Sequence, residues 1–316
     1  MRIIRVVESE NNFCSLHWSV EHSWRYVLVD DSDAAAYSPI EVGYYIHYGV
    51  RGGRRVEVKR AIELSSSSGC PMGCKYCASG SLPAIEFLSA DSICEAFELV
   101  YAERHERCSD GEGLPLRVTY TGIGELRYVM DSVEESVGRL NARHNGLSFT
   151  LSTCCLDPLM LSRVEAIASN AKLHCLQVTL ASSDPRIVAS LVDYYQSERF
   201  DVHKLVGLIQ TTTLPLVRIN YVVVGGRNDS DAEFESIAQT FAPVASKVSF
   251  RVSSMNETMA SRRNRLVPPD PSRCDRLVRI LVSRGIRAYA YRAMRDDCMN
   301  CGQLVSEYKA QTGIVV

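Results

Sequence analysis

The sequence predicts an α/β protein whose main body is a partial (β/α)6 TIM-like barrel preceded by a small β-rich extension. Three observations predict this fold. After residue 60, six short apolar runs alternate with helix-like segments, which favours a parallel sheet with right-handed crossovers. A loop rich in glycine and cysteine follows the first run, at the strand end where such barrels carry their chemistry. The chain of 316 residues is long enough for one such barrel with a substantial core.

The expected organisation is an extension over residues 1–60 and a barrel over 61–316. In the extension, strands are predicted at 24–29, 41–48 and 54–60, separated by the turn-rich segments DDSDAAAYSP and GVRGG. The charged run RGGRRVEVKR at 51–60 is predicted to be a solvated strand, with a phosphate-contacting edge as the alternative.

Strands and helices of the barrel follow in alternation. The predicted barrel strands are 60–64, 116–121, 147–153, 176–181, 217–224 and 247–252. The predicted helices are 90–105, 128–143, 158–170, 186–195, 202–210 and 231–241. A last helix at 272–284 and a last strand at 286–292 are expected to flank the barrel.

Composition excludes several classes of protein. With 35 basic and 37 acidic residues, the net charge of −2 is not that of a protein that grips RNA by charge alone. The N-terminal segment MRIIRVVESENN has no apolar signal core, and no run approaches 18 consecutive apolar residues, so no membrane partner is expected. Twelve cysteines without a secretory signal are typical of reduced thiols, and we predict a cytoplasmic location.

The loop SSSSGCPMGCKYCASGS at 65–81 places Cys70, Cys74 and Cys77 in a C-x3-C-x2-C spacing. Three thiolates on one loop can hold three corners of a [4Fe–4S] cluster, which leaves the fourth iron open to a small molecule. Tyr76, just before the third cysteine, suits a loop that faces an adenine. One alternative is a zinc loop, but zinc normally takes four ligands in two separated pairs. Another is a non-catalytic iron–sulfur protein, which would need a fourth ligand.

Polar side chains also gather at the predicted strand ends. The second barrel strand ends in TGIGE, where the backbone edge and the Glu125 carboxylate could receive an amino group. Ser152, Thr179 and Asn256 end later strands. Taken singly these are ordinary turn residues, but their shared position on one barrel face makes them candidate ligands.

The cysteine spacing, with an aromatic residue before the last cysteine, resembles the hallmark of the radical S-adenosylmethionine superfamily. More narrowly, the chain resembles the RlmN/Cfr family, which methylates an adenine ring carbon in RNA. Over residues 24–308 it carries, in that family's order, SSSSGCPMGCKYCASG, TGIGE, LSFTLST, LQVTLASSDPR, RINYVVVGGRNDSD and RDDCMNCGQL.

The resemblance implies the cofactors and their ligands. A [4Fe–4S] cluster would be held by Cys70, Cys74 and Cys77, and reduced by an external one-electron donor of the flavodoxin or ferredoxin type. S-adenosylmethionine would be contacted by Gly124, Glu125, Ser152, Thr179, Leu180, Ala181 and Asn256. Cys301 would be the counterpart of the cysteine that accepts a methyl group. A 5′-deoxyadenosyl radical would then abstract hydrogen from that methyl, and the resulting carbon radical would add to an sp2 carbon.

Three departures from the family pattern open a second hypothesis. Glu63 stands where the family has the cysteine that releases the product, with Cys298 as a conceivable substitute. Ala181 replaces a family histidine, and the family's N-terminal helical RNA-binding domain is not expected in the residues before Cys70. The substrate is therefore either an adenine-containing RNA methylated through Cys301, or a nucleoside-type small molecule. For the small molecule, Cys301 would be a thiol donor or covalent handle.

The cysteines near the C-terminus allow one more hypothesis. Cys298 and Cys301 form a C-x2-C pair that could hold an auxiliary metal site with Cys154 and Cys155. The alternative is that all four are reduced thiols and that Cys301 alone is functional.

Overall fold

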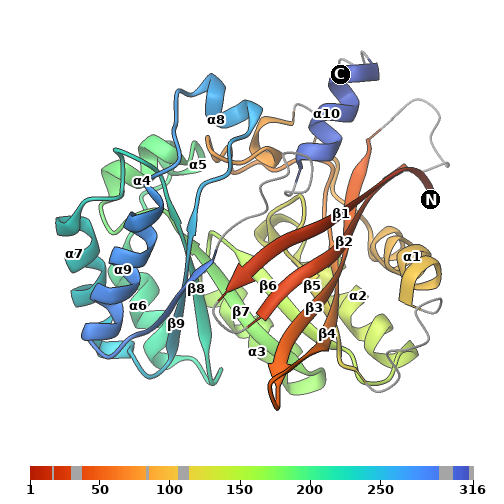
Figure 1. Cartoon of the computed structure of the whole chain (residues 1–316), viewed down its shortest axis with the longest axis horizontal. Helices are drawn as coiled ribbons and strands as arrows, with labels where there is room; N and C mark the ends of the chain where they lie inside the picture. The colour runs from red at the N-terminus through yellow and green to blue at the C-terminus, as the bar shows by residue number, and fades with distance from the viewer. Residues whose placement is uncertain (16–17, 30–37, 83–84, 106–113, 292–301, 313–316) are drawn as a thin grey trace.

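The computed structural model describes the chain except residues 16–17, 30–37, 83–84, 106–113, 292–301 and 313–316. The described strands form one ten-stranded sheet whose spatial order follows the chain, β1 to β10 (Figure 1). The first four strands pair antiparallel: β1 (Arg2–Ser15), β2 (Trp18–Val29), β3 (Ile40–Arg51) and β4 (Arg54–Leu64). From β4 onward every pair is parallel, as the alternating pattern predicts.

The parallel strands match the predicted runs closely. They are β5 (Leu116–Tyr120), β6 (Ser148–Thr153), β7 (Leu173–Leu180), β8 (Val217–Val223), β9 (Val248–Ser254) and β10 (Arg287–Tyr291). The predicted strands 54–60 and 60–64 are one strand, β4, because no turn residue separates them. The sequence did not predict β1, whose run RIIRVVES lacks strict alternation of apolar and polar residues.

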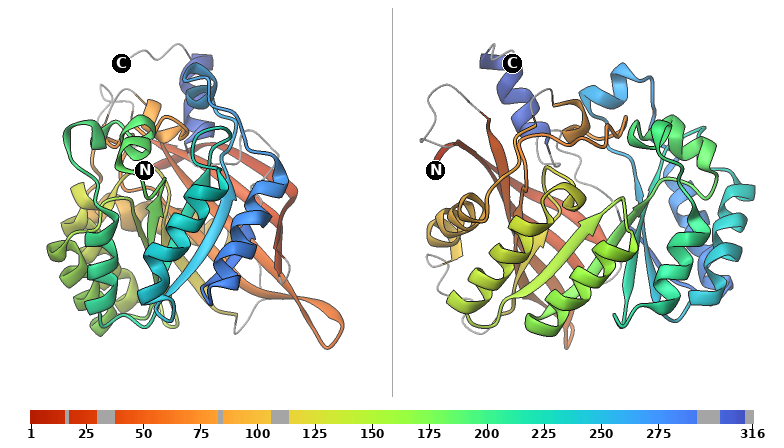
Figure 2. Two further views of the ribbon diagram at one scale, coloured as in Figure 1. Left: turned by 90° about the vertical axis from the view of Figure 1, so that its left-hand side faces the viewer. Right: turned by 180° about the vertical axis from the view of Figure 1, so that it is seen from behind.

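Helices cover the outer face of the sheet (Figure 2). The main ones are α1 (Ala90–Val100), α2 (Met130–Arg143), α3 (Pro158–Asn170), α6 (Val202–Thr211), α7 (Asp231–Phe241) and α9 (Pro271–Ser283). Side-chain N-caps fix the starts of five of them, from Ser89, Asp157, Asp201, Ser230 and Asp270. Short turns complete the chain: η1 (Ser79–Ser81), η2 (Tyr101–His105), η4 (Leu126–Tyr128) and η5 (Ala242–Val244).

Three helical details differ from the prediction. The predicted helix 186–195 is two pieces, α4 (Pro185–Leu191) and α5 (Tyr194–Ser197). The break occurs because Val192 is extended and forms a β-bridge with Cys74 in the cysteine loop. Two short helices, α8 (Met259–Arg263) and α10 (Gln303–Thr312), were not predicted. In the described part of the chain, no helix is both long and apolar enough to span a bilayer.

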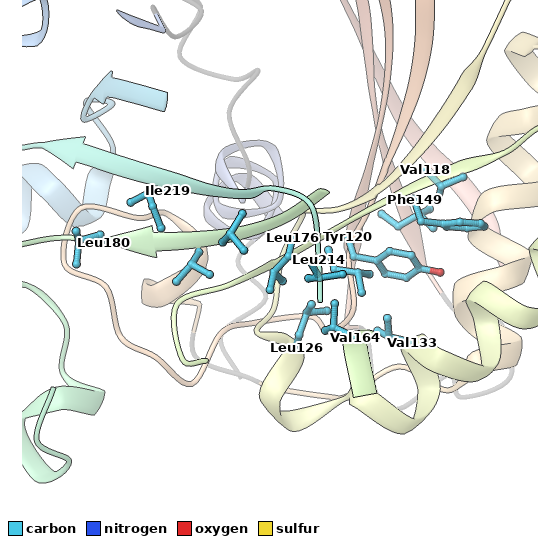
Figure 3. Close-up of a cluster of buried hydrophobic side chains, with 14 of the residues drawn as sticks. Val118, Tyr120, Leu126, Val133, Phe149, Val164, Leu176, Leu180, Leu214 and Ile219 are labelled. Carbon is cyan, nitrogen blue, oxygen red and sulfur yellow. The ribbon is translucent and has the colours of Figure 1, made fainter. Parts of the chain in front are cut away.

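The main hydrophobic core lies between the sheet and its covering helices. Val118, Phe149 and Leu176, from adjacent strands, face Val133 of α2 and Val164 of α3 (Figure 3). All five side chains are fully buried. Because side chains alternate along a strand, the residues between them point into the interior of the curved sheet.

The N-terminal strands close this interior. Val20 of β2, Tyr45 of β3 and Ala61 of β4 pack together with Tyr291 of β10, the last strand of the sheet. β1 also approaches β10, so the first strands cross in front of the parallel ones (Figure 1). The antiparallel strands therefore form the barrel wall that the six predicted β/α units would leave open.

Candidate active site

The cysteine loop begins where β4 ends and is fixed to the loop after β5. The Ser66 and Ser67 N–H groups both donate to the Ile123 carbonyl, at 2.8 and 3.2 Å. The Ile123 N–H in turn donates to Ser65 Oγ at 3.1 Å. Both loops leave the carboxyl ends of adjacent parallel strands, so the cysteine loop and the TGIGE segment meet at one edge of the barrel.

Gly124 is required at the contact between these loops. Its φ of +127° lies in a region that side chains with a Cβ rarely adopt. A Cβ at this position would lie 2.2 Å from Ser66 Oγ and 2.7 Å from Ser67 Oγ. The glycine therefore allows the backbone before Glu125 to approach the cysteine loop.

Cys70, Cys74 and Cys77 lie together in this loop, against an apolar cluster that includes Met72 and Met255. Burial, together with the neighbouring Cys74 and Cys77 thiols, raises the pKa of Cys70 well above its ordinary value. Burial likewise raises the pKa of Cys77. Three thiols on one buried loop are suited to a cationic partner that would hold them as thiolates. This donor set fits an iron–sulfur cluster.

A zinc loop is the alternative use of these cysteines. Among the described residues, no group of three or more His, Cys, Asp or Glu side chains is placed to hold a metal ion. In a cuboidal cluster each cysteine binds a different iron, so its three sulfurs are farther apart than the ligands of one ion. A structural zinc ion would need four ligands that converge on one point.

The three cysteines face a cavity of about 460 Å3 that runs into the barrel. Its wall includes residues from every strand between β2 and β10. The predicted site residues that line it are Glu63, Cys70, Cys74, Tyr76, Cys77, Gly124, Glu125, Ser152, Thr179 and Asn256. The structure thus brings together residues that are almost 200 positions apart in the chain.

Two predicted contacts do not line this cavity. Thr179 faces inward, so Leu180 faces outward, and its side chain is buried in the core beneath the helices (Figure 3). Ala181 packs in the apolar cluster beside Met72 and Tyr76, and its carbonyl accepts a hydrogen bond from Asn228. Leu180 therefore offers no side chain to the cavity, and either residue would contact a ligand there through its backbone.

The Glu125 carboxylate is buried and bound to the end of β6. It accepts hydrogen bonds from the Thr153 hydroxyl, from Cys154 N at 2.9 Å and from Cys154 Sγ at 3.0 Å. The Cys154 thiol also hydrogen-bonds to Cys74. Cys154 therefore lies beside the cysteine loop and lines the cavity, whereas Cys155 is buried in the adjacent apolar cluster.

Comparisons with known proteins point to one group of enzymes, although no family model matches the chain. The probable dual-specificity RNA methyltransferase RlmN of Prochlorococcus marinus (strain NATL2A) is 30% identical over 261 residues, covering 76% of this chain and 66% of that protein. RlmN of Sorangium cellulosum is 29% identical over 260 residues, covering 79% and 62%. RlmN of Syntrophobacter fumaroxidans is 24% identical over 281 residues, covering 83% and 76%.

A radical SAM methyltransferase from Sphaerobacter thermophilus has the same fold, with a TM-score of 0.71 at 20% identity, covering 96% of this chain and 80% of that one. The chain belongs to the radical S-adenosylmethionine enzymes related to RlmN. The predicted fold class and the predicted enzyme class are thereby confirmed. The chain spans 62 to 76% of the length of the three RlmN relatives.

In this RlmN-related enzyme, Glu63 belongs to a buried ionic network. Its carboxylate lies 2.7 Å from Arg25 Nη1 and accepts a hydrogen bond from Thr121 Oγ1 at 2.9 Å. Arg25, only 3% exposed, also pairs with Glu41 at 3.4 Å. Burial raises the pKa of Glu41, although the Arg25 charge acts in the opposite direction. No sequence motif indicated Arg25 or Glu41, because the partners come from three different strands.

Cys298 and Cys301 lie outside the described residues, but the residue that follows Cys301 is placed. The Gly302 N–H donates to Glu41 Oε2 at 2.8 Å, and the Val305 N–H donates to Glu41 Oε1 at 2.7 Å. Gly302, with a φ of +79°, is so close to Ser79 that a Cβ would lie 2.5 Å from Ser79 Oγ. The RlmN-related enzyme thus holds the start of α10 against the loop that carries Cys77, and Figure 1 shows α10 at the same end of the barrel as this loop.

Some side chains of the charged run at 51–60 are exposed to solvent, and another lines the cavity. Arg54 and Arg55 are exposed, as predicted for a solvated strand. Lys59 instead lines the cavity, where Arg117, Arg218 and Arg251 from three parallel strands also lie. The sequence does not indicate these three arginines, because a lone arginine within a strand does not reveal which face it occupies.

Proposed function

We propose that this chain is a radical S-adenosylmethionine methyltransferase that modifies an unsaturated carbon of a nucleoside-type small molecule. In this proposal Cys70, Cys74 and Cys77 hold a [4Fe–4S] cluster, and Cys301 carries the transferred carbon. Once bound and reduced by an external donor of the flavodoxin or ferredoxin type, the cluster supplies the electron that cleaves S-adenosylmethionine. The observation that carries the proposal is that all three loop cysteines face one cavity, together with Ser152, Thr179 and Asn256.

The chain's own residues would bind and orient the reactants. Hydroxyls of Ser152 and Thr179 and the amide of Asn256 offer hydrogen bonds at the cavity mouth, where S-adenosylmethionine would lie between the cluster and the barrel interior. Glu41 would hold the segment after Cys301 beside the cysteine loop. Reduced thiols in these roles favour the cytoplasm as the location.

Glu63 favours a small-molecule substrate over the family's RNA route. A carboxylate cannot attack a sulfur-linked intermediate and release it as a thiol can, and this carboxylate is already paired with Arg25. Product release from Cys301 therefore requires another thiol, for which Cys298 is the candidate from the sequence. The small-molecule hypothesis also has a route without such a thiol, because Cys301 used as a thiol donor would leave its sulfur on the product.

RNA is the second candidate substrate, since the relatives are named as RNA methyltransferases. One surface feature favours it. Phe87 and Tyr128 are 47% and 39% exposed and stack with ring centroids 5.8 Å apart and planes 7° from parallel. Such a pair offers an aromatic face to an unstacked base.

The test is turnover by the full chain, reconstituted with iron and sulfide and reduced with dithionite. We expect S-adenosylmethionine to be converted to 5′-deoxyadenosine, and intact-protein mass spectrometry to show one added methyl group on Cys301. Failure to form 5′-deoxyadenosine with dithionite, flavodoxin or ferredoxin would overturn the proposal. An unmodified Cys301 in an active preparation would exclude its role as methyl carrier.

A further inference from the structure

Four cationic side chains line the inner part of the barrel cavity: Lys59 of β4, Arg117 of β5, Arg218 of β8 and Arg251 of β9. Arg117 precedes Thr121, the first residue after β5, by four positions, and Lys59 precedes Glu63 of β4 by four positions. At about 3.3 Å per residue, both lie roughly 13 Å along the strand from the edge that carries the cysteine loop. The cavity therefore has the cluster ligands at its mouth and positive charge at its inner end.

The cations share one space. Burial and the charges of Arg117 and Arg218 lower the pKa of Lys59 to about 7. Burial, followed by the charge of Arg218, lowers the pKa of Arg117 to about 10. These groups therefore repel one another, which costs folding free energy in the absence of an anion.

The carboxylates on the described wall are paired with other groups. The carboxylates that line the cavity are Glu63 and Glu125, and they are engaged by Arg25 and by the end of β6, respectively. Within the described part of the chain, the Nε atoms of Arg117, Arg218 and Arg251 are buried without a hydrogen-bond partner. Buried donors are almost always satisfied in native proteins, so three unpaired guanidinium nitrogens around one cavity indicate a bound acceptor.

We propose that Lys59, Arg117, Arg218 and Arg251 bind the phosphate groups of a small phosphorylated substrate. Guanidinium groups match phosphate oxygens with paired hydrogen bonds, and a phosphate monoester carries nearly two negative charges where a carboxylate carries one. A cavity of about 460 Å3 is of the size that takes a small organic ligand. With phosphate at the inner end, the organic part of the substrate would extend toward the cysteine loop.

The enclosure favours a small molecule over a polynucleotide. Strands from β2 to β10 all contribute to the wall, so an internal phosphate of an RNA chain has no continuous groove through the barrel. This inference deepens the proposed function by naming the substrate class, and it rests on that function only for the identity of the reaction. Binding of phosphate can be measured without turnover.

The test is titration calorimetry of the full reconstituted chain with inorganic pyrophosphate. We expect the wild type to bind, and the double variant Arg117→Met/Arg218→Met to bind at least about 100-fold more weakly, since each charged hydrogen-bonding group contributes roughly tenfold or more. Arg163→Met is the matched control, because Arg163 pairs with Glu134 on the surface and should leave affinity unchanged. The double variant should also melt at a higher temperature than the wild type without pyrophosphate, since it loses unpaired buried charge.

Three results would overturn the proposal. Either the wild type fails to bind pyrophosphate, or the double variant binds it as tightly as the wild type, or Arg163→Met weakens binding as much as the double variant does. A lower melting temperature of the double variant would make the arginines structural.

Adenosine 5′-diphosphate should displace pyrophosphate and adenosine should not. Displacement by an RNA hairpin as effective as that by the nucleotide would assign the site to RNA. If the wild type binds pyrophosphate but forms no 5′-deoxyadenosine, the proposed function is wrong and this inference stands. If it forms 5′-deoxyadenosine but does not bind pyrophosphate, this inference is wrong and the proposed function stands.

Lys59 predicts a pH dependence of anion binding. The charged or titratable groups that face it are Arg117, Arg218, Cys175 and Arg251. The arginines keep their charge near neutral pH. Burial, followed by nearby cations, lowers the pKa of His174 to about 3, and burial with Lys59 lowers the pKa of His47 well below its ordinary value. These imidazoles therefore stay neutral, and Lys59 is the cation that is lost as pH rises through 7.

Sulfate is the suitable probe for this dependence, because its charge is constant between pH 6 and 9. We expect its affinity to fall as pH rises above about 7, by up to roughly tenfold per pH unit, because one bound proton is linked to binding. Lys59→Met should bind sulfate more weakly at pH 6 and show no such fall. If the affinity for sulfate falls equally with rising pH in the wild type and in the variant, Lys59 does not belong to the anion site.

Discussion

Replacing Arg25 by methionine is expected to lower the free energy of unfolding by about 3–5 kcal/mol, because it leaves the buried carboxylate of Glu41 and the partly buried one of Glu63 without their cation. Arg25 Nη1 lies 2.7 Å from Glu63 and 3.4 Å from Glu41, whose side chain is fully buried. Methionine keeps most of the side-chain volume, so the loss reports the charge rather than a cavity. Because Glu41 also holds Gly302 and Val305, the N-terminus of α10 should become accessible to protease.

Urea unfolding measures this effect, with Arg139→Met as the matched control. Arg139 pairs with Asp91 and Glu135 at the surface, where such pairs contribute about 1 kcal/mol or less. The double variant Arg25→Met/Glu63→Gln should recover part of the loss, since one of the two unpaired charges is removed. If Arg25→Met and Arg139→Met cost the same, the network does not stabilise the barrel wall.

Replacing Cys74 by alanine is expected to reduce both bound iron and 5′-deoxyadenosine formation to background while the chain stays folded. Cys74 is one of the three loop thiols that face the cavity, and two thiolates do not retain a cuboidal cluster against loss of iron. Cys154→Ala is a demanding control, because its thiol hydrogen-bonds to Cys74 but lies outside the C-x3-C-x2-C motif. The control should keep its iron and its ability to cleave S-adenosylmethionine.

Iron and sulfide analysis with visible absorption checks this prediction, and circular dichroism checks that both variants are folded. Full iron content in Cys74→Ala would remove Cys74 from the ligand set. Loss of the cluster in Cys154→Ala would instead make Cys154 a ligand, which would leave no iron open to S-adenosylmethionine.

Local patterns in the sequence predicted most of the barrel. The helices Pro158–Asn170 and Asp231–Phe241 were predicted with their observed bounds, because an N-cap residue precedes an apolar repeat of helical period. The cysteine loop and the TGIGE segment were predicted to meet, since both follow adjacent parallel strands. These features depend on a few consecutive residues and on a rule of topology.

Contacts between distant segments could not be predicted in this way. Val192 ends α4 because it pairs with Cys74, more than a hundred residues earlier in the chain. The wall formed by β1 to β4, and with it the Arg25 network, depends on how the sheet closes on β10. Lys59 lies in a run of charged residues, where alternation gives no sign of which side chain points inward.

The proposed function depends on three cysteines that hold a cluster with one iron left open. The most direct measurement is electron paramagnetic resonance of the reduced, reconstituted protein before and after addition of S-adenosylmethionine. We expect about four irons per chain, and a spectrum whose g values shift when S-adenosylmethionine binds the open iron. A spectrum that S-adenosylmethionine leaves unchanged, or zinc in place of iron, would contradict the claim.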